Sequence, residues 1–130
     1  MNPLASKITE AEVEVMKVLW EAEEELPIAE IRKTLSITSD WEDSTIKTLV
    51  RRLCKKGVIK STKREVLYYK ALVSEDEYND YITADVIDRL YSGSAKNLVA
   101  SLIDNKRLDD SDIEELRNFF KVGEKDEWKP

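Results

Sequence analysis

The stretch that decides the fold is Ser44–Lys70, which reads STIKTLVRRLCKKGVIKSTKREVLYYK. It holds nine basic residues and one acid, Glu65, and therefore carries a net charge of +8. The whole chain of 130 residues has a formal charge of −6, so the remaining residues carry −14. Such a basic island within an acidic protein is typical of a surface that meets phosphate groups. We call Ser44–Lys70 the basic island.

The first half of the basic island predicts a helix. Its apolar residues recur with the spacing of one buried helical face, at Ile46, Leu49, Val50 and Leu53. Asp43 or Ser44 is expected to cap its start, because short polar side chains accept hydrogen bonds from the first free backbone N–H groups. Gly57 stands where a left-handed C-terminal cap is expected. The sequence therefore predicts a helix from about Asp43 to Gly57.

The second half of the basic island predicts a β-hairpin. Val58–Thr62 and Val66–Val73 are rich in Val, Ile, Thr and Tyr, which favour strands. The turn is expected at 63–65, without the glycine that such a tip usually has.

Two further helices are predicted before the basic island. Thr9 and Glu12 have the spacing of a capping box, and the helix that follows should reach about Glu23. Pro27 suits the first residue of a second helix, and 36–42 reads as a polar connection. The inner face of this second helix is expected at Ile28, Ile31 and Leu35. Three helices followed by a hairpin is the order of a winged helix-turn-helix.

Three helices are predicted after the hairpin, beginning near Ser74, Ala95 and Asp109, and Ser74 and Glu77 have the spacing of a second capping box. A region of about 55 residues rarely forms a secure core alone, so we expect it to pair with a second copy. The apolar residues expected in this homodimer contact are Tyr78, Ile82, Val86, Leu98, Leu102, Phe119 and Phe120. The fold class is thus mainly α with a small β-hairpin, comprising a winged-helix DNA-binding domain at 1–73 and a helical dimerisation region at 74–130.

In a winged helix the third helix enters the major groove of double-stranded DNA and the hairpin contacts the flanking backbone. The outward side chains expected to contact DNA are Ser44, Thr45, Lys47, Thr48, Arg51, Arg52, Lys55, Lys63 and Arg64. A solvated basic helix face is the alternative. DNA binding is favoured because the hairpin adds cations at the expected place and the rest of the chain is acidic.

Composition excludes several other classes. The chain has no histidine and one cysteine, so histidine-dependent catalysis, an intrachain disulfide and a cysteine zinc site are excluded. We expect no enzyme activity, no metal and no cofactor. No apolar run approaches the roughly 20 residues of a membrane span, and no signal peptide is recognised, which predicts a cytoplasmic protein without membrane insertion. Cys54 is interpreted as a structural thiol rather than a redox switch. A solvated helix end, rather than a partner site, is expected at Glu21, Glu23, Glu24 and Glu25.

Trp41–Gly57, which reads WEDSTIKTLVRRLCKKG, looks like the third-helix signature of the BlaI/MecI/CopY penicillinase repressors and is the most specific match. The resemblance to this family covers almost the whole chain. The other matching segments are Ile8–Glu12, Val18–Trp20, Tyr68–Tyr69, Val73–Tyr78, Leu90–Ser94 and Asp112–Leu116.

The resemblance implies a homodimeric repressor that binds a palindromic operator and controls β-lactam-resistance genes. In the β-lactam branch, a membrane penicillin-sensing metalloprotease receptor triggers cleavage of the repressor in its dimerisation region. Ser101-Leu102 stands where that family commonly has the cleaved Asn-Phe bond, and it is the candidate cleavage bond here. Copper sensing needs several cysteines, whereas this chain has only Cys54. The alternatives are a winged-helix protein-interaction module and a repressor of the same family with a different inducer.

Overall fold

The structure is a computed structural model that describes residues 2–125. The chain divides into two compact units, the N-terminal unit Met1–Ala84 and the C-terminal unit Asp85–Pro130. The boundary falls within one helix, α4 (Glu75–Leu90).

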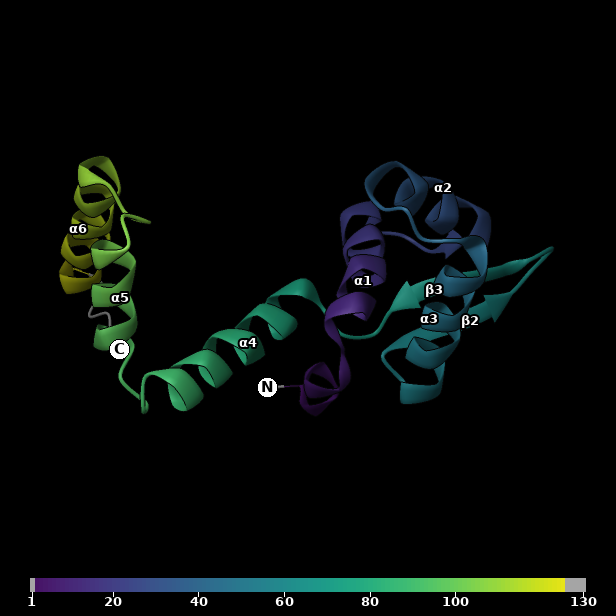
Figure 1. Ribbon diagram of the computed structural model, residues 1–130, viewed down its shortest axis with the longest axis horizontal. Coiled ribbons are helices and arrows are strands. Elements are labelled where there is room, and N and C mark those ends of the chain that lie inside the picture. Colours follow the sequence, from purple (N-terminus) through teal and green to yellow (C-terminus); the bar gives the residue numbers. More distant parts are fainter. Residues whose placement is uncertain (1, 126–130) are drawn as a thin grey trace. The chain divides into compact units, whose positions relative to one another are not determined.

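The N-terminal unit contains helices and a small antiparallel sheet in the order of a winged helix (Figure 1). Its elements before α4 are η1 (Pro3–Lys7), α1 (Glu10–Ala22), β1 (Leu26–Pro27), α2 (Ile28–Thr38), α3 (Asp43–Lys56), β2 (Ile59–Lys63) and β3 (Leu67–Ala71). The strand order in the sheet is β1-β3-β2. The predicted fold class, mainly α with a β-hairpin, is confirmed.

Capping boxes begin two of the helices, as the sequence predicts. At α1 the Glu12 N–H donates to Thr9 Oγ1 over 3.2 Å, and the Thr9 N–H donates to Glu12 Oε1 over 3.0 Å. At α4 the corresponding bonds join Ser74 and Glu77 over 3.0 and 2.9 Å. Each box provides hydrogen-bond acceptors for two backbone N–H groups that have no partner within the helix.

The apolar faces of α1, α2 and α3 meet in one core with the first residue of the wing. The four predicted apolar positions of α3 are at most 5% exposed. The largest fully buried side chains are Met16, Ile31, Leu35, Ile46, Leu53, Glu12, Val15, Val58 and Val73. Val15 and Glu12 were not predicted to be buried.

Among the residues whose burial is described, Glu12 is the one charged residue that is buried, and its partner is Lys56 at the last turn of α3. Lys56 Nζ lies 2.6 Å from Glu12 Oε1 and 2.9 Å from Oε2, and it also donates to the Lys7 carbonyl oxygen over 2.9 Å. Burial alone would raise the pKa of Glu12, but the Lys56 ammonium and the Thr9 hydrogen bonds hold it below the ordinary value of 4.5. The pair therefore links α1 to α3, and the Lys56 bond to Lys7 also links α3 to η1.

Several predicted boundaries were wrong by a few residues. The polar connection expected from residue 36 begins only after Thr38, because α2 continues and the Ser39 N–H closes on the Leu35 carbonyl over 2.8 Å. The N-cap of α3 is Glu42, with no side-chain cap bond, rather than Asp43 or Ser44. Strand β1 and helix η1 were not predicted, because neither has a periodicity long enough to detect.

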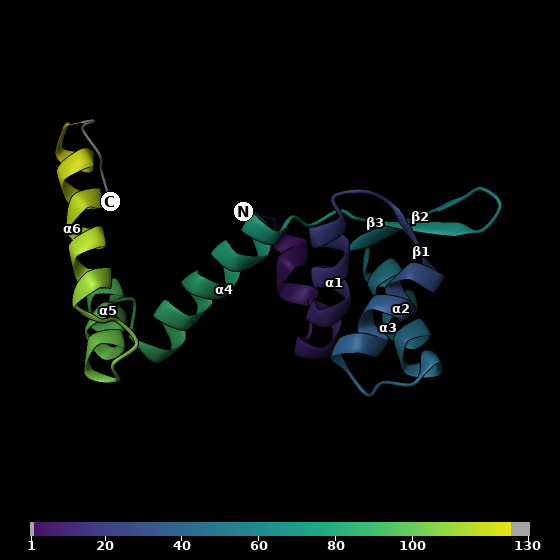
Figure 2. The ribbon, with the colours of Figure 1, turned by 90° about the horizontal axis from the view of Figure 1, so that it is seen from above.

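The wing is the β2-β3 hairpin, and its tip extends beyond the helices of the N-terminal unit (Figure 2). Strand pairing runs from Ile59 opposite Ala71 to Lys63 opposite Leu67. A three-residue loop, 64–66, joins the strands and is closed by the Arg64 N–H donating to the Val66 carbonyl over 3.0 Å. None of these three residues has a positive φ, so the tip needs no glycine.

The C-terminal unit holds the end of α4 together with α5 (Ala95–Asp104) and α6 (Asp110–Lys125). Gly93, at φ +82°, follows α4, and Ser94 caps α5. No side chain described in α4, α5 or α6 is buried. The exposed large apolar side chains include Leu90, Val99, Ile103, Leu116, Phe119 and Phe120. Within residues 2–125, no helix is long and apolar enough to cross a membrane.

The Glu12–Lys56 pair gives the first prediction. Glu12→Gln leaves the Lys56 ammonium without its counter-charge, and we expect a loss of roughly 2–3 kcal/mol in unfolding free energy. Because the pKa of Glu12 is lowered by folding, the pair stabilises the fold above about pH 4.5. That contribution is lost as the pH falls through the lowered pKa.

Urea unfolding at several pH values measures both effects. The Glu12→Gln variant should have a lower midpoint at pH 7 and a flatter dependence on acidification than the wild type. Glu21→Gln removes an equal charge from an exposed site on the same helix and should change little. Equal midpoints for Glu12→Gln and Glu21→Gln would contradict the role of the pair.

Candidate nucleic-acid interface

Helix α3 is oriented by its own amphipathic pattern. Its apolar face is buried against α1 and α2, so the opposite face is exposed to solvent. Gly57 ends the helix in the left-handed conformation, with φ +79°, and turns the chain into the wing. At the other end, Arg32 of α2 lies 3.6 Å from Asp43 and ties the start of α3 to its neighbour.

The structure brings the predicted DNA-contact residues of α3 onto this outward face. Every one of them is exposed except Thr48, which is half-buried and donates its hydroxyl to the Ser44 carbonyl over 2.9 Å. Small hydroxyl side chains therefore stand near the helix start, and the exposed Arg51, Arg52 and Lys55 follow toward its end. Hydroxyls and guanidinium groups are able to hydrogen-bond base edges and phosphate oxygens.

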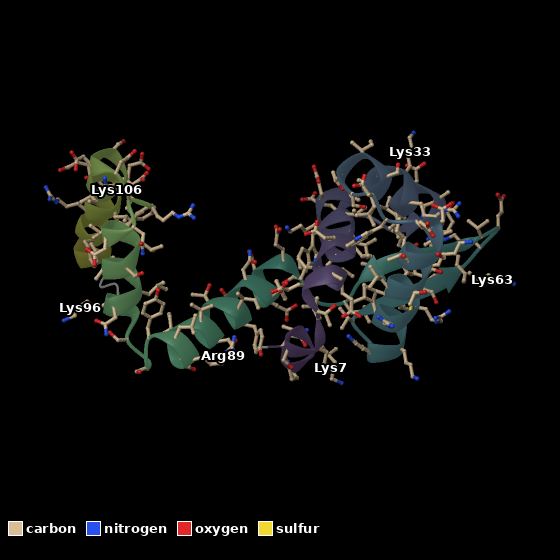
Figure 3. All side chains as sticks on the ribbon, in the orientation of Figure 1. Lys7, Lys33, Lys63, Arg89, Lys96 and Lys106 are labelled. Carbon is tan, nitrogen blue, oxygen red and sulfur yellow. The ribbon has the colours of Figure 1, made fainter. Side chains whose placement is uncertain are left out.

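The wing presents the remaining predicted cations. Figure 3 shows Lys63 at the hairpin, extending away from the helices. Lys63 and Arg64 are both exposed. Next to them, Val66 and Leu67 are also exposed, at 51% and 42%, although neither was predicted as a contact residue.

Two cations of the basic island have acidic partners inside the N-terminal unit. Lys56 is taken up by Glu12, so it belongs to the core edge rather than to the outward face. Arg64 Nη2 lies 2.7 Å from Glu25 Oε2, and its guanidinium stacks 5.0 Å from the centre of the Tyr68 ring. The expectation that Glu25 belongs to a solvated helix end was wrong: its side chain is 26% exposed and ion-paired.

No local signal in the sequence pointed to the Glu25–Arg64 pair. The two residues lie far apart along the chain, and the strand β1 that brings them together has only two residues. Leu26 pairs with Tyr69 and Pro27 with Tyr68, which places Glu25 beside the wing.

An open hollow of about 410 Å³ lies between α3 and the sheet. Its lining residues are Ile28, Lys47, Val50, Arg51, Cys54, Ser61, Leu67 and Tyr69. Two of these, Lys47 and Arg51, are predicted DNA contacts. Burial raises the pKa of the Cys54 thiol and the pKa of the Tyr69 hydroxyl, so both groups are neutral at pH 7.

The fold and its exposed basic face define a winged-helix DNA-binding protein. A protein-family model described as "Penicillinase repressor" matches residues 8–121. The chain therefore belongs to the penicillinase repressor family.

The chain is similar to named members of this family over most of its length. The chain is 34% identical over 111 residues to the penicillinase repressor of Bacillus licheniformis, and the match covers 85% of this chain and 86% of that one. It is 33% identical over 121 residues to the methicillin resistance regulatory protein MecI of Staphylococcus aureus strain N315, covering 92% and 98%. The solution structure of the DNA-binding domain of the repressor BlaI matches with a TM-score of 0.52 and 38% identity, over 60% of this chain and 94% of that domain.

The position of Cys54 gives the second prediction. A half-buried thiol with a raised pKa is a poor nucleophile, so iodoacetamide should alkylate Cys54 slowly in the folded protein at pH 7.5 and much faster in 6 M urea. Mass spectrometry of timed samples measures both rates. Equal rates in the two conditions would contradict the structural assignment of this thiol.

Proposed function

We propose that the protein is a homodimeric transcriptional repressor that binds a palindromic operator and controls β-lactam-resistance genes. Two copies of α3 occupy major grooves on one side of the duplex, and the bound dimer blocks transcription. Half-sites then lie about one helical turn apart, or a multiple of it. Because its ligand is operator DNA, we place the protein in the cytoplasm.

The observation that carries this proposal is the outward face of α3 beside the wing. Exposed hydroxyls and cations lie on one side of a helix whose other side is fixed in the core. The solved structure that matches this fold at 38% identity is named as a DNA-binding domain, that of the repressor BlaI. The names of the relatives, penicillinase repressor and methicillin resistance regulatory protein, support β-lactam resistance as the regulated property.

Residue roles follow from reach and position. Arg51 and Arg52 are the main candidates for contacts to bases or to phosphates next to them, because a guanidinium matches guanine O6 and N7. The remaining predicted contacts on α3 and Lys63 on the wing hold phosphate and fix the register. No group of side chains on the chain is assigned a catalytic role.

We assign residues 1–73 to DNA binding and 74–130 to dimerisation. The C-terminal unit supports this assignment, because none of its described side chains is buried although many are apolar. A second copy would remove these surfaces from water. Of the residues predicted for the dimer contact, Phe119 is 72% exposed, whereas Tyr78 packs on Trp20 of its own unit at 5.7 Å between ring centres.

Release from DNA is proposed to follow cleavage at Ser101-Leu102, triggered by a membrane penicillin-sensing metalloprotease receptor. This bond lies inside α5, where the Ser101 carbonyl accepts hydrogen bonds from the Asn105 N–H over 3.0 Å and from Asn105 Nδ2 over 2.9 Å. Tyr91 also donates its hydroxyl to Ser101 Oγ over 3.0 Å. Since proteases bind extended backbone, this turn of α5 must unwind before the bond is cut.

The third prediction tests the role of α3. The probe is a set of duplexes enriched from random sequence by repeated rounds of binding to the wild-type protein. Arg51→Ala or Arg52→Ala should weaken binding to the enriched duplex by ~1–3 kcal/mol and relax its sequence preference. Lys63→Ala should instead weaken all duplexes alike and reduce the salt slope by about 1. Fluorescence anisotropy at two salt concentrations measures these changes.

Arg107→Ala is the control, because it removes an exposed arginine from the C-terminal unit. It should leave the affinity nearly unchanged. If Arg51→Ala and Arg52→Ala both bind like the wild type, α3 does not read the groove. If no sequence is enriched at all, the basic face serves a different acidic partner, as in a protein-interaction module.

The fourth prediction tests dimerisation. Sedimentation velocity of the full chain at micromolar concentration should give a dimer. Phe119→Asp should shift the equilibrium toward the monomer by placing a charge in the apolar contact, whereas the neighbouring exposed Asn118→Asp should not. A monomeric wild-type protein under these conditions would overturn the proposed pairing.

A further inference from the structure

We propose that Glu25 is a brake on the wing: it holds Arg64 by an ion pair that DNA phosphate must displace, and so lowers the affinity of the protein for the DNA backbone. This proposal rests on the proposed function, since it concerns the same interface. It assigns a role to an acidic residue outside the basic island.

The first support is the geometry of Arg64. Its guanidinium nitrogen Nη2 is 2.7 Å from Glu25 Oε2, and the guanidinium carbon is 5.0 Å from the centre of the Tyr68 ring. Two contacts thus hold one side chain against the sheet. Arg64 nevertheless remains 59% exposed, so a phosphate that approaches the wing can reach it.

The second support is the environment of Glu25. Its Oε2 is buried and has no hydrogen-bond partner among the described residues, so its contact with Arg64 Nη2 at 2.7 Å is an ion pair without hydrogen-bond geometry. The nearby guanidinium therefore supplies the electrostatic compensation for that oxygen. Moving Arg64 from this oxygen to a phosphate would leave the buried oxygen of a charged carboxylate uncompensated, which is unfavourable. A contact between Arg64 and a DNA phosphate therefore contributes less net binding free energy than the same contact made by an unpaired arginine.

The third support is the way the fold places the two residues. Glu25 immediately precedes β1, and β1 pairs with β3 through Leu26 opposite Tyr69 and Pro27 opposite Tyr68, which places Glu25 at the edge of the wing. Glu21, Glu23 and Glu24, which lie just before it, are exposed. Among the described residues, Glu25 is the one of these four acids that forms an ion pair, and its partner belongs to the wing.

The test compares Glu25→Gln with Glu24→Gln in the full chain. Both substitutions remove one negative charge at nearly the same place, so long-range electrostatics change alike. Only Glu25→Gln releases Arg64. We expect Glu25→Gln to bind a random-sequence duplex at least about threefold more tightly than Glu24→Gln, as the loss of an exposed or half-exposed ion pair allows. Its salt slope should be steeper by about 0.9 for each additional phosphate contact.

A double-mutant cycle with Arg64→Ala identifies the partner. In the Arg64→Ala background, Glu25→Gln should no longer tighten binding relative to Glu24→Gln, because the released side chain is absent. Circular dichroism and thermal unfolding confirm that each variant is folded before binding is compared. A gain that persists without Arg64, or equal affinities for Glu25→Gln and Glu24→Gln, would overturn the brake. Weaker binding by Glu25→Gln would also overturn it, since Glu25 would then orient Arg64 for DNA.

Elution from heparin separates this proposal from the proposed function. Heparin is a polyanion without base sequence, so Glu25→Gln should elute at a higher salt concentration than Glu24→Gln even if no duplex sequence is preferred. A wild-type protein that binds heparin but no duplex would contradict the repressor function. The difference in heparin elution between Glu25→Gln and Glu24→Gln would then still test the brake. Identical elution of the two variants would reject the brake while operator binding stands.

Discussion

The N-terminal unit depends on one buried ion pair, Glu12 with Lys56. Glu12 completes the capping box of α1, and the same carboxylate receives the ammonium from the last turn of α3. Lys56 also reaches the Lys7 carbonyl, so the N-terminal segment, α1 and α3 meet at one charged point. An apolar contact could hold these elements together, but it would not specify their register as closely, because hydrogen bonds between charged groups have strict geometry. The apolar face of α3 determines which side chains face outward, and this junction fixes its last turn against α1.

Positive charge in the basic island has three different uses. Lys56 is half-buried at the edge of the core and ties α3 to α1, while Arg51, Arg52, Lys55 and Lys63 are exposed. Arg64 is intermediate, because it is exposed and also paired with Glu25. A count of lysines and arginines therefore overstates the charge that is free to meet phosphate. The acidic residues of the N-terminal unit are in part the reason, since two of them neutralise cations of the island.

Sequence reasoning succeeded where the pattern is local. The helical spacing of Ile46 to Leu53, the glycine cap at Gly57 and the two capping boxes were all recognisable, because each depends on residues within a few positions. They predicted the winged-helix order and the outward face of α3. Contacts between distant segments were not predictable in this way. Glu12 was identified as a cap but not as a buried partner of Lys56, and Glu25 gave no signal, because each acquires its role only when separate elements pack. The contact residues themselves remain predictions, since DNA would be needed to test them.

The loop at the tip of the wing has a consequence for how such proteins diversify. Its three residues reverse the chain with no positive φ, and each is exposed. Most L-amino acids adopt such backbone angles without strain, so the identity of these side chains is not dictated by the turn. Natural variation could therefore alter the charge or polarity of the tip, one residue at a time, while the hairpin keeps its register. Affinity for the backbone of DNA could drift in this way independently of the sequence that α3 reads.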